Sequence, residues 1–151
     1  MQENDKNIEI ATFAAGCFWG IEDAFMQTNG VVRTEVGYTG GHTQNPTYKE
    51  VCTDKTGHAE AVNVYFDPNI ISYEKLLDIF WNLHDPTQFN RQGPDYGSQY
   101  RSAIFYHNQI QENIAEKSKE ELNKSGKYSK KIVTEITLSG EFYKAEEYHQ
   151  Q

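Results

Sequence analysis

The chain contains 151 residues, and its 14 basic and 22 acidic side chains leave a formal net charge of −8. This length predicts one domain spanning residues 1–151, and an aromatic fraction of 13% supplies large side chains for a core. The acidic balance disfavours a surface for nucleic acid or anionic membranes. No apolar run reaches the ~20 residues that cross a bilayer, and the polar start Met1–Asn7 differs from a secretory signal. We expect a cytoplasmic monomer.

The first elements in chain order are a strand, a helix and a second strand. Ile8–Ala14 is a short apolar strand, and Phe18–Thr28 has helical periodicity that stops at Asn29-Gly30. The apolar positions of this helix are Phe18, Ile21 and Phe25. Val31–Tyr38 is the second strand, and a polar, Gly-rich stretch follows from Thr39 to Gly57. Because a loop of this length in a compact domain is usually functional or disordered, we expect it to carry function.

The middle of the chain repeats the pattern of strand, helix and loop. Ala59–Phe66 alternates as a strand with Glu60, Val62, Val64 and Phe66 on one face. Ser72 caps a helix that runs to about His84. The apolar stripe of that helix consists of Leu76, Ile79, Phe80 and Leu83. A second irregular stretch, Asp85–Gln99, contains two prolines and two glycines.

The last predicted elements are the strand Arg101–His107, the charged helix Gln109–Lys124 and the strand Lys131–Leu138. The charged face of the helix is expected to be solvated. This order of elements predicts an α+β fold, a ferredoxin-like split βαβ sandwich with long functional loops and an extra helix and strand.

The two cysteines, Cys17 and Cys52, are too few for a disulfide scaffold and favour a reducing compartment. No metal site is predicted, because the histidines follow no zinc-binding spacing. They are His42, His58, His84, His107 and His149. The segment from Gly37 to Gly41 lacks the lysine of a P-loop and the glycine spacing of a dinucleotide-binding motif, so no nucleotide cofactor is expected.

Cys17 lies between the first strand and the first turn of a helix. Unpaired N–H groups and a partial positive charge at a helix start favour the thiolate, which is the nucleophilic form of cysteine. The alternative is a small hydrophobe buried in the core. Phe18 and Trp19 favour a nucleophilic Cys17 over a buried one. The apolar stripe of the helix needs only one of these two rings, and both together predict an apolar pocket around the sulfur.

The residues around Cys17 resemble the active-site motif of the A-type peptide methionine sulfoxide reductases. The resemblance covers nearly the whole chain, in order, through Gly16-Cys17-Phe18-Trp19-Gly20, Gly37-Tyr38-Thr39-Gly40-Gly41, Pro46-Thr47-Tyr48, Thr56-Gly57-His58-Ala59-Glu60, His84-Asp85-Pro86-Thr87, the segment 92–102 and Ala145-Glu146-Glu147-Tyr148-His149-Gln150. It implies thiol-dependent reduction of the S epimer of methionine sulfoxide, free or in proteins, and hence repair of oxidised proteins.

The resemblance also implies a role for each site residue. Cys17 matches the nucleophile, and Glu60 matches the acid that donates to the sulfoxide oxygen. A carboxyl facing an aromatic pocket is desolvated, which raises its pKa and suits that role. Tyr48 and Tyr100 match tyrosines that hydrogen-bond the oxygen, and Asp95 matches an acid that orients water and substrate. Phe18 and Trp19 would hold the methyl group of the substrate.

The chain departs from the family pattern in the step that recycles the enzyme. Many members have a resolving cysteine near the C-terminus and are reduced by thioredoxin, whereas no cysteine follows Cys52 here. The chain is therefore either trimmed from a longer one or a one-cysteine enzyme that an external thiol recycles. Cys52 is the one internal candidate resolver, although cysteines at its position are usually bystanders.

Two other functions are compatible with parts of the sequence. A cysteine hydrolase or acyl-transferase would need a histidine base, and no histidine is close to Cys17 in sequence. A non-catalytic domain that binds methionine-like side chains would have little use for a buried Glu60.

Overall fold

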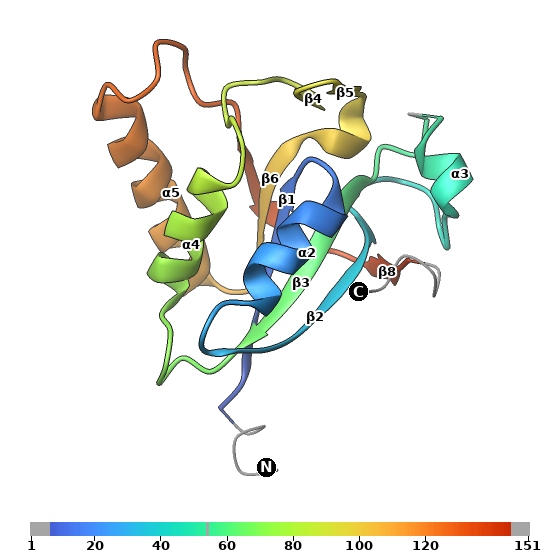
Figure 1. Cartoon of the computed structure of the whole chain (residues 1–151). Coiled ribbons are helices and arrows are strands. Elements are labelled where there is room, and N and C mark those ends of the chain that lie inside the picture. Colours follow the sequence, from blue (N-terminus) through green and yellow to red (C-terminus); the bar gives the residue numbers. More distant parts are fainter. Residues whose placement is uncertain (1–6, 54, 146–151) are drawn as a thin grey trace.

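The computed structural model describes residues 7–53 and 55–145. The elements are β1 (Glu9–Ala15), α2 (Phe18–Met26), β2 (Val31–Thr39), α3 (Tyr48–Val51), β3 (Ala59–Phe66), α4 (Tyr73–Asn82), β4 (Arg91–Gln92), β5 (Asp95–Tyr96), the 3-10 turn η1 (Ser98–Tyr100), β6 (Ser102–Tyr106), α5 (Gln109–Lys124), β7 (Glu135–Leu138) and β8 (Phe142–Lys144). The predicted α+β class is confirmed (Figure 1).

A six-stranded mixed sheet forms the centre of the molecule, with the order β7-β6-β1-β3-β2-β8. The ladders β1–β3, β1–β6, β2–β3 and β2–β8 are antiparallel, and β6–β7 is parallel. Strand β3 is central and is buried along nearly all its length. Its bounds are those predicted from the alternating pattern, and its predicted inner face packs against the helices.

The main core lies between the sheet and the helices α2, α4 and α5 (Figure 1). Phe13 from β1 stacks on Phe25 of α2 at 5.3 Å between ring centroids and on Phe80 of α4 at 5.1 Å. The three predicted apolar positions of α2 are all buried. These aromatic contacts fix the helices on the sheet, because each such pair adds about 0.5–1.5 kcal/mol beyond its buried area.

Helix α4 begins where the sequence predicts, since the Ser72 hydroxyl accepts a hydrogen bond from the Lys75 N–H at 3.1 Å. Its buried surface is wider than predicted. Leu77 and Trp81 are buried beside the predicted stripe, and the Trp81 indole N–H donates to the Ser118 hydroxyl of α5 at 2.8 Å. The wider buried surface is explained by helix α5, because α5 packs against a second side of α4.

The strand expected over Lys131–Leu138 is shorter, and it starts at Glu135. The residues before it bond to other segments. The Ile132 N–H donates to the Asn123 side chain at 2.9 Å, and the Val133 N–H donates to the Pro86 carbonyl at 2.9 Å. The sequence motif at 145–150 lies outside the described residues after Ala145. In the described part of the chain, no helix is long and apolar enough to cross a membrane.

Candidate active site

Cys17 is the N-cap residue of α2, separated from the end of β1 by Gly16, and the residue is a free, exposed cysteine. The preceding residue, Gly16, has φ of +94°, a conformation that side-chain-bearing residues rarely adopt. A methyl group on Gly16 would also lie 3.0 Å from Cβ of Gln92. The turn that presents Cys17 therefore requires glycine for two separate reasons.

Glu60 lies on β3 opposite Tyr38 of β2 and is 1% exposed. Its Oε1 accepts a hydrogen bond from the Phe18 N–H in the first turn of α2 at 3.2 Å. Its Oε2 has no hydrogen-bond partner among the described residues. Burial raises the pKa of Glu60 to about 7, the Asp95 charge adds to the rise, and the Phe18 N–H opposes it. Around neutral pH this carboxyl therefore holds a proton much of the time.

The pKa of the Cys17 thiol is raised, mainly by desolvation and also by the nearby charges of Glu60 and Asp95. The backbone N–H groups of Trp19 and Gly20 act in the opposite direction, as expected at a helix start. The helix N-terminus favours the thiolate of Cys17, as expected from the sequence, but desolvation and the two carboxyl charges outweigh it, so the net shift of the Cys17 pKa is upward. Negative charge on Glu60 therefore disfavours the thiolate form of Cys17.

Tyr48 comes from the first irregular stretch, Tyr100 directly follows the second, and the two meet at this site. Tyr48 opens α3, whose start is fixed by a capping box between Thr47 and Glu50. The pKa of Tyr48 is raised, first by a side-chain hydrogen bond with Cys52 and then by burial and the nearby acidic groups. Burial and the charge of Glu60 raise the pKa of Tyr100, whereas a hydrogen bond with Tyr48 lowers it. Both tyrosines keep their hydroxyl protons at neutral pH and can donate.

Asp95 lies on β5 and pairs with Gln92 in the two-stranded hairpin β4–β5. Its negative charge raises the pKa values of Cys17, Glu60 and Tyr100, so all three groups lie within its field. The structure therefore brings together the five residues expected to be catalytic, from α2, β3, α3, η1 and the hairpin. A thiol, a buried carboxyl whose pKa is about 7 and two tyrosine hydroxyls face one site, and this set of groups is able to carry out proton-coupled thiol chemistry.

The two aromatic residues after Cys17 occupy different environments. Phe18 is 1% exposed and packs on Tyr38 at 5.9 Å between centroids, so it belongs to the core. Trp19 is 53% exposed, with its ring 6.4 Å from that of Phe18. Of the two rings, only the indole of Trp19 is therefore accessible to solvent beside the start of α2.

Comparison with known proteins identifies the family. The sequence model described as "Peptide methionine sulfoxide reductase" matches residues 9–151. The chain is 64% identical over 146 residues to peptide methionine sulfoxide reductase MsrA of Methanosarcina acetivorans, which covers 97% of this chain and 78% of that protein. The chain belongs to the peptide methionine sulfoxide reductase family.

Solved structures of Mxr1 from Saccharomyces cerevisiae share the fold. The reduced form of Mxr1 from Saccharomyces cerevisiae is 38% identical with a TM-score of 0.90, covering 96% of this chain and 83% of Mxr1. Mxr1 has also been crystallised in complex with Trx2, and that structure is 29% identical with a TM-score of 0.70, covering 95% of this chain and 85% of Mxr1.

Two histidines near the reductase site are engaged elsewhere. The Nδ1 atom of His58 accepts from the Gly41 N–H at 3.0 Å, and its Nε2 lies 2.8 Å from the Thr43 carbonyl, so His58 holds the loop that leads to Tyr48. His84 contacts the Phe80 carbonyl at 2.9 Å and the Ser102 hydroxyl at 2.7 Å, and burial lowers its pKa to about 4. Neither ring has a free nitrogen to serve as a base for Cys17, which disfavours the hydrolase interpretation.

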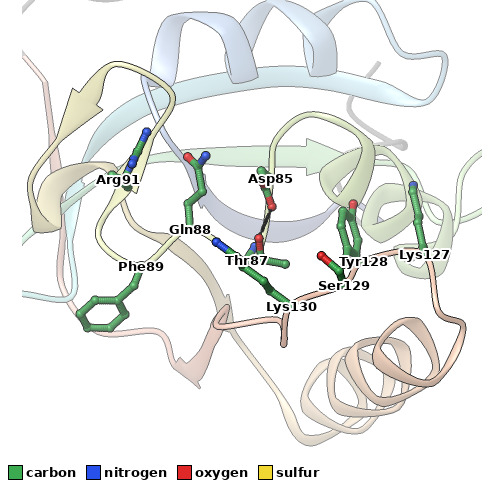
Figure 2. A pocket seen from close by; sticks show the side chains of 9 residues that line it. All are labelled: Asp85, Thr87, Gln88, Phe89, Arg91, Lys127, Tyr128, Ser129 and Lys130. Carbon is green, nitrogen blue, oxygen red and sulfur yellow. Dashed lines mark hydrogen bonds between the residues drawn. The ribbon is translucent and has the colours of Figure 1, made fainter.

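A polar hollow of about 480 Å³ lies beside the hairpin (Figure 2). Its lining residues are Asp85, Thr87, Gln88, Phe89, Arg91, Lys127, Tyr128, Ser129 and Lys130. Arg91 is the neighbour of Gln92, so opposite sides of the same short strand border the hollow and the Cys17 turn. In residues 7–53 and 55–145 no three side chains form a group that could hold a metal ion.

Proposed function

We propose that this chain reduces the S epimer of methionine sulfoxide, free or in proteins, with Cys17 as the nucleophile and Glu60 as the proton donor. The observation that carries the proposal is an exposed thiol beside a buried carboxyl whose pKa is about 7 and whose Oε2 has no partner among the described residues. A carboxyl in this state is able to protonate an oxygen that becomes negatively charged near Cys17.

With a pKa of about 7, Glu60 is ionised in part of the molecules at neutral pH, and there the chemical step begins with transfer of the thiol proton of Cys17 to Glu60, which forms a thiolate beside a neutral acid. The thiolate attacks the sulfoxide sulfur, and the proton of Glu60 passes to the sulfoxide oxygen. The sulfur–oxygen bond of the substrate and the new sulfur–sulfur bond then both break as the oxygen forms a bond to the Cys17 sulfur. The products are methionine and a Cys17 sulfenic acid, so Cys17 is oxidised, the substrate is reduced and Glu60 is left ionised.

The remaining residues orient the substrate. The neutral hydroxyls of Tyr48 and Tyr100 donate hydrogen bonds to the sulfoxide oxygen as charge develops on it. Asp95 orients water and the substrate. Trp19, with Phe18 behind it, receives the methyl group of the substrate, and such a pocket discriminates by about 1–3 kcal/mol per methylene group.

The sulfenic acid is recycled by an external thiol of the thioredoxin class. The thiol attacks the Cys17 sulfur, water leaves, and a second thiol resolves the mixed disulfide to regenerate Cys17. This partner is supported by the relative Mxr1, which was crystallised with Trx2. In this one-cysteine route Cys52 remains a thiol, and its contact with Tyr48 gives it a place beside the site without an oxidation step.

We also propose that residues 1–151 act as one catalytic domain. The strand order β6-β1-β3-β2, with α2 and α4 as the crossovers, supports a ferredoxin-like split βαβ centre to which α5, β7 and β8 are added. The free cysteines fit the cytoplasm as the place of action. A net charge of −8 supports a monomer.

The test is turnover of the separate S and R epimers of methionine sulfoxide with a dithiol reductant. The wild-type protein is expected to consume the S epimer only. Cys17→Ser should form no methionine, whereas the matched variant Cys52→Ser should still convert the S epimer. Methionine formation by Cys17→Ser at the wild-type rate would overturn the assignment of the nucleophile.

A further inference from the structure

The side chain of Gln92 bridges both main-chain groups of Asp85. Its Oε1 accepts a hydrogen bond from the Asp85 N–H at 3.1 Å, and its Nε2 donates to the Asp85 carbonyl at 2.6 Å. A primary amide supplies one acceptor and two donors, so it satisfies the N–H and the carbonyl of one residue together. These two bonds fasten β4 to the start of the loop 85–90.

The methylene groups of the same side chain lie against the turn that presents Cys17. A methyl group on Gly16 would lie 3.0 Å from Cβ and 3.1 Å from Cγ of Gln92, closer than ordinary van der Waals contact. Gly16 immediately precedes Cys17, and Gln92 is the ladder partner of Asp95. One side chain therefore contacts the nucleophile turn and pairs, through its backbone, with the hairpin acid.

We propose that Gln92 is a positioning residue that fixes Asp95 relative to Cys17 by clamping the β4–β5 hairpin between the Asp85 backbone and the Gly16 turn. The inference rests on the proposed function, because it concerns two residues of that site. Gln92 does not touch the substrate; it acts through the placement of Asp95 and of the turn that carries the thiol.

The clamp has an electrostatic consequence that a purely structural role lacks. Asp95 contributes to the raised pKa of both Cys17 and Glu60. The other titratable groups that face this cluster among the described residues are Tyr48, Tyr100 and Cys52, which come from outside the hairpin. If the hairpin loosens, the charge of Asp95 moves away from the thiol and the pKa of Cys17 falls. Removing that charge directly, by Asp95→Asn, should have the same effect.

The test compares Gln92→Met with the matched variant Gln88→Met. Methionine keeps the length of the side chain and its packing but loses both hydrogen bonds. Gln88 anchors the tip of the same hairpin, where its Oε1 accepts from the Gly93 N–H at 2.8 Å. For the S epimer, Gln92→Met is expected to lower kcat/KM by about ten- to a hundredfold, the loss typical of a misplaced reactive group. The loss of kcat/KM in Gln88→Met should be several-fold smaller than that in Gln92→Met. Equal losses in the two variants would overturn the proposal.

The decisive readout is the pH dependence of Cys17 alkylation by iodoacetamide, followed by peptide mass spectrometry so that Cys52 is counted separately. The midpoint for Cys17 should shift to lower pH in Gln92→Met and in Asp95→Asn. In the double variant the midpoint should shift no further than in Asp95→Asn alone, because both substitutions remove the same effect, that of the Asp95 charge on Cys17. Additive shifts, or an unchanged midpoint in Gln92→Met, would refute the clamp.

A substitute variant and the alkylation assay allow the clamp to be tested separately from folding and from turnover. If Gln92→Met does not fold, Gln92→Glu replaces it, because an ionised carboxylate keeps the acceptor for the Asp85 N–H and loses only the donor to its carbonyl. Its kcat/KM should be reduced relative to wild type, and a wild-type value would overturn the proposal. Alkylation requires no turnover, so a wild-type protein that fails to reduce sulfoxide would refute the proposed function without affecting the test of the clamp.

Discussion

The buried carboxyl of Glu60 should make the stability of the protein depend on pH in a specific direction. Its pKa is about 7 in the folded protein against an ordinary value of 4.5. Between these values the folded state binds more protons than the unfolded state, so the free energy of unfolding falls as pH rises through this window. At 1.36 kcal/mol per pKa unit, the full loss is about 3 kcal/mol. Below pH 4.5 Glu60 contributes no such loss.

Glu60→Gln removes this titration and should flatten that part of the pH profile. Near pH 8 the variant is expected to be more stable than wild type by up to about 3 kcal/mol, and near pH 4 the two should be similar. Urea unfolding at several pH values measures the difference. Glu121→Gln, which removes an exposed carboxyl of α5, changes the net charge equally and should leave the profile as in wild type. Parallel profiles for wild type and Glu60→Gln would refute the reasoning.

Three further predictions concern residues around the site. Trp19→Ala should raise KM for the S epimer in steady-state assays, because the exposed indole receives the methyl group; an unchanged KM would place the pocket elsewhere. Gly16→Ala should lower the free energy of unfolding, measured in urea, by about 1–3 kcal/mol, the usual cost of a strained backbone position. The control Gly20→Ala should be neutral or stabilising, because an added Cβ there meets nothing within 4 Å. Equal effects of the two substitutions would contradict backbone strain at Gly16. Burial lowers the pKa of His84 from 6.5 to about 4, so stability should fall as pH drops through this range. In urea titrations His84→Gln should remove about 2–3 kcal/mol of that fall, and an unchanged acid profile would contradict this.

The central elements were predictable because their periodicity reflects burial. The α2 stripe of Phe18, Ile21 and Phe25 faces the core, and the predicted bounds of the strand at 59–66 are those of β3. The hairpin β4–β5 was not predicted, because strands of two residues carry no alternating pattern. Strand β8 was missed for another reason: its three residues pair with β2, about 105 positions earlier in the chain, as in Tyr38 with Tyr143.

The pKa shifts at the site were less predictable from the sequence than the residues that form it. The helix start at Cys17 is evident from sequence, but the opposing charges come from β3 and from the hairpin. Their combined effect depends on distances that the order of residues does not contain. The role of Gln92 was invisible for the same reason, since Asp85 and Gly16 meet it only in the folded chain.

The most direct test of the proposed chemistry is a single turnover of racemic methionine sulfoxide by the pre-reduced protein, with methionine and remaining thiols counted. We expect one methionine per protein, consumption of the S epimer alone, and loss of the Cys17 thiol while Cys52 stays free. Formation of no methionine would contradict the reductase function, and loss of both thiols would contradict the one-cysteine route and make Cys52 the resolver.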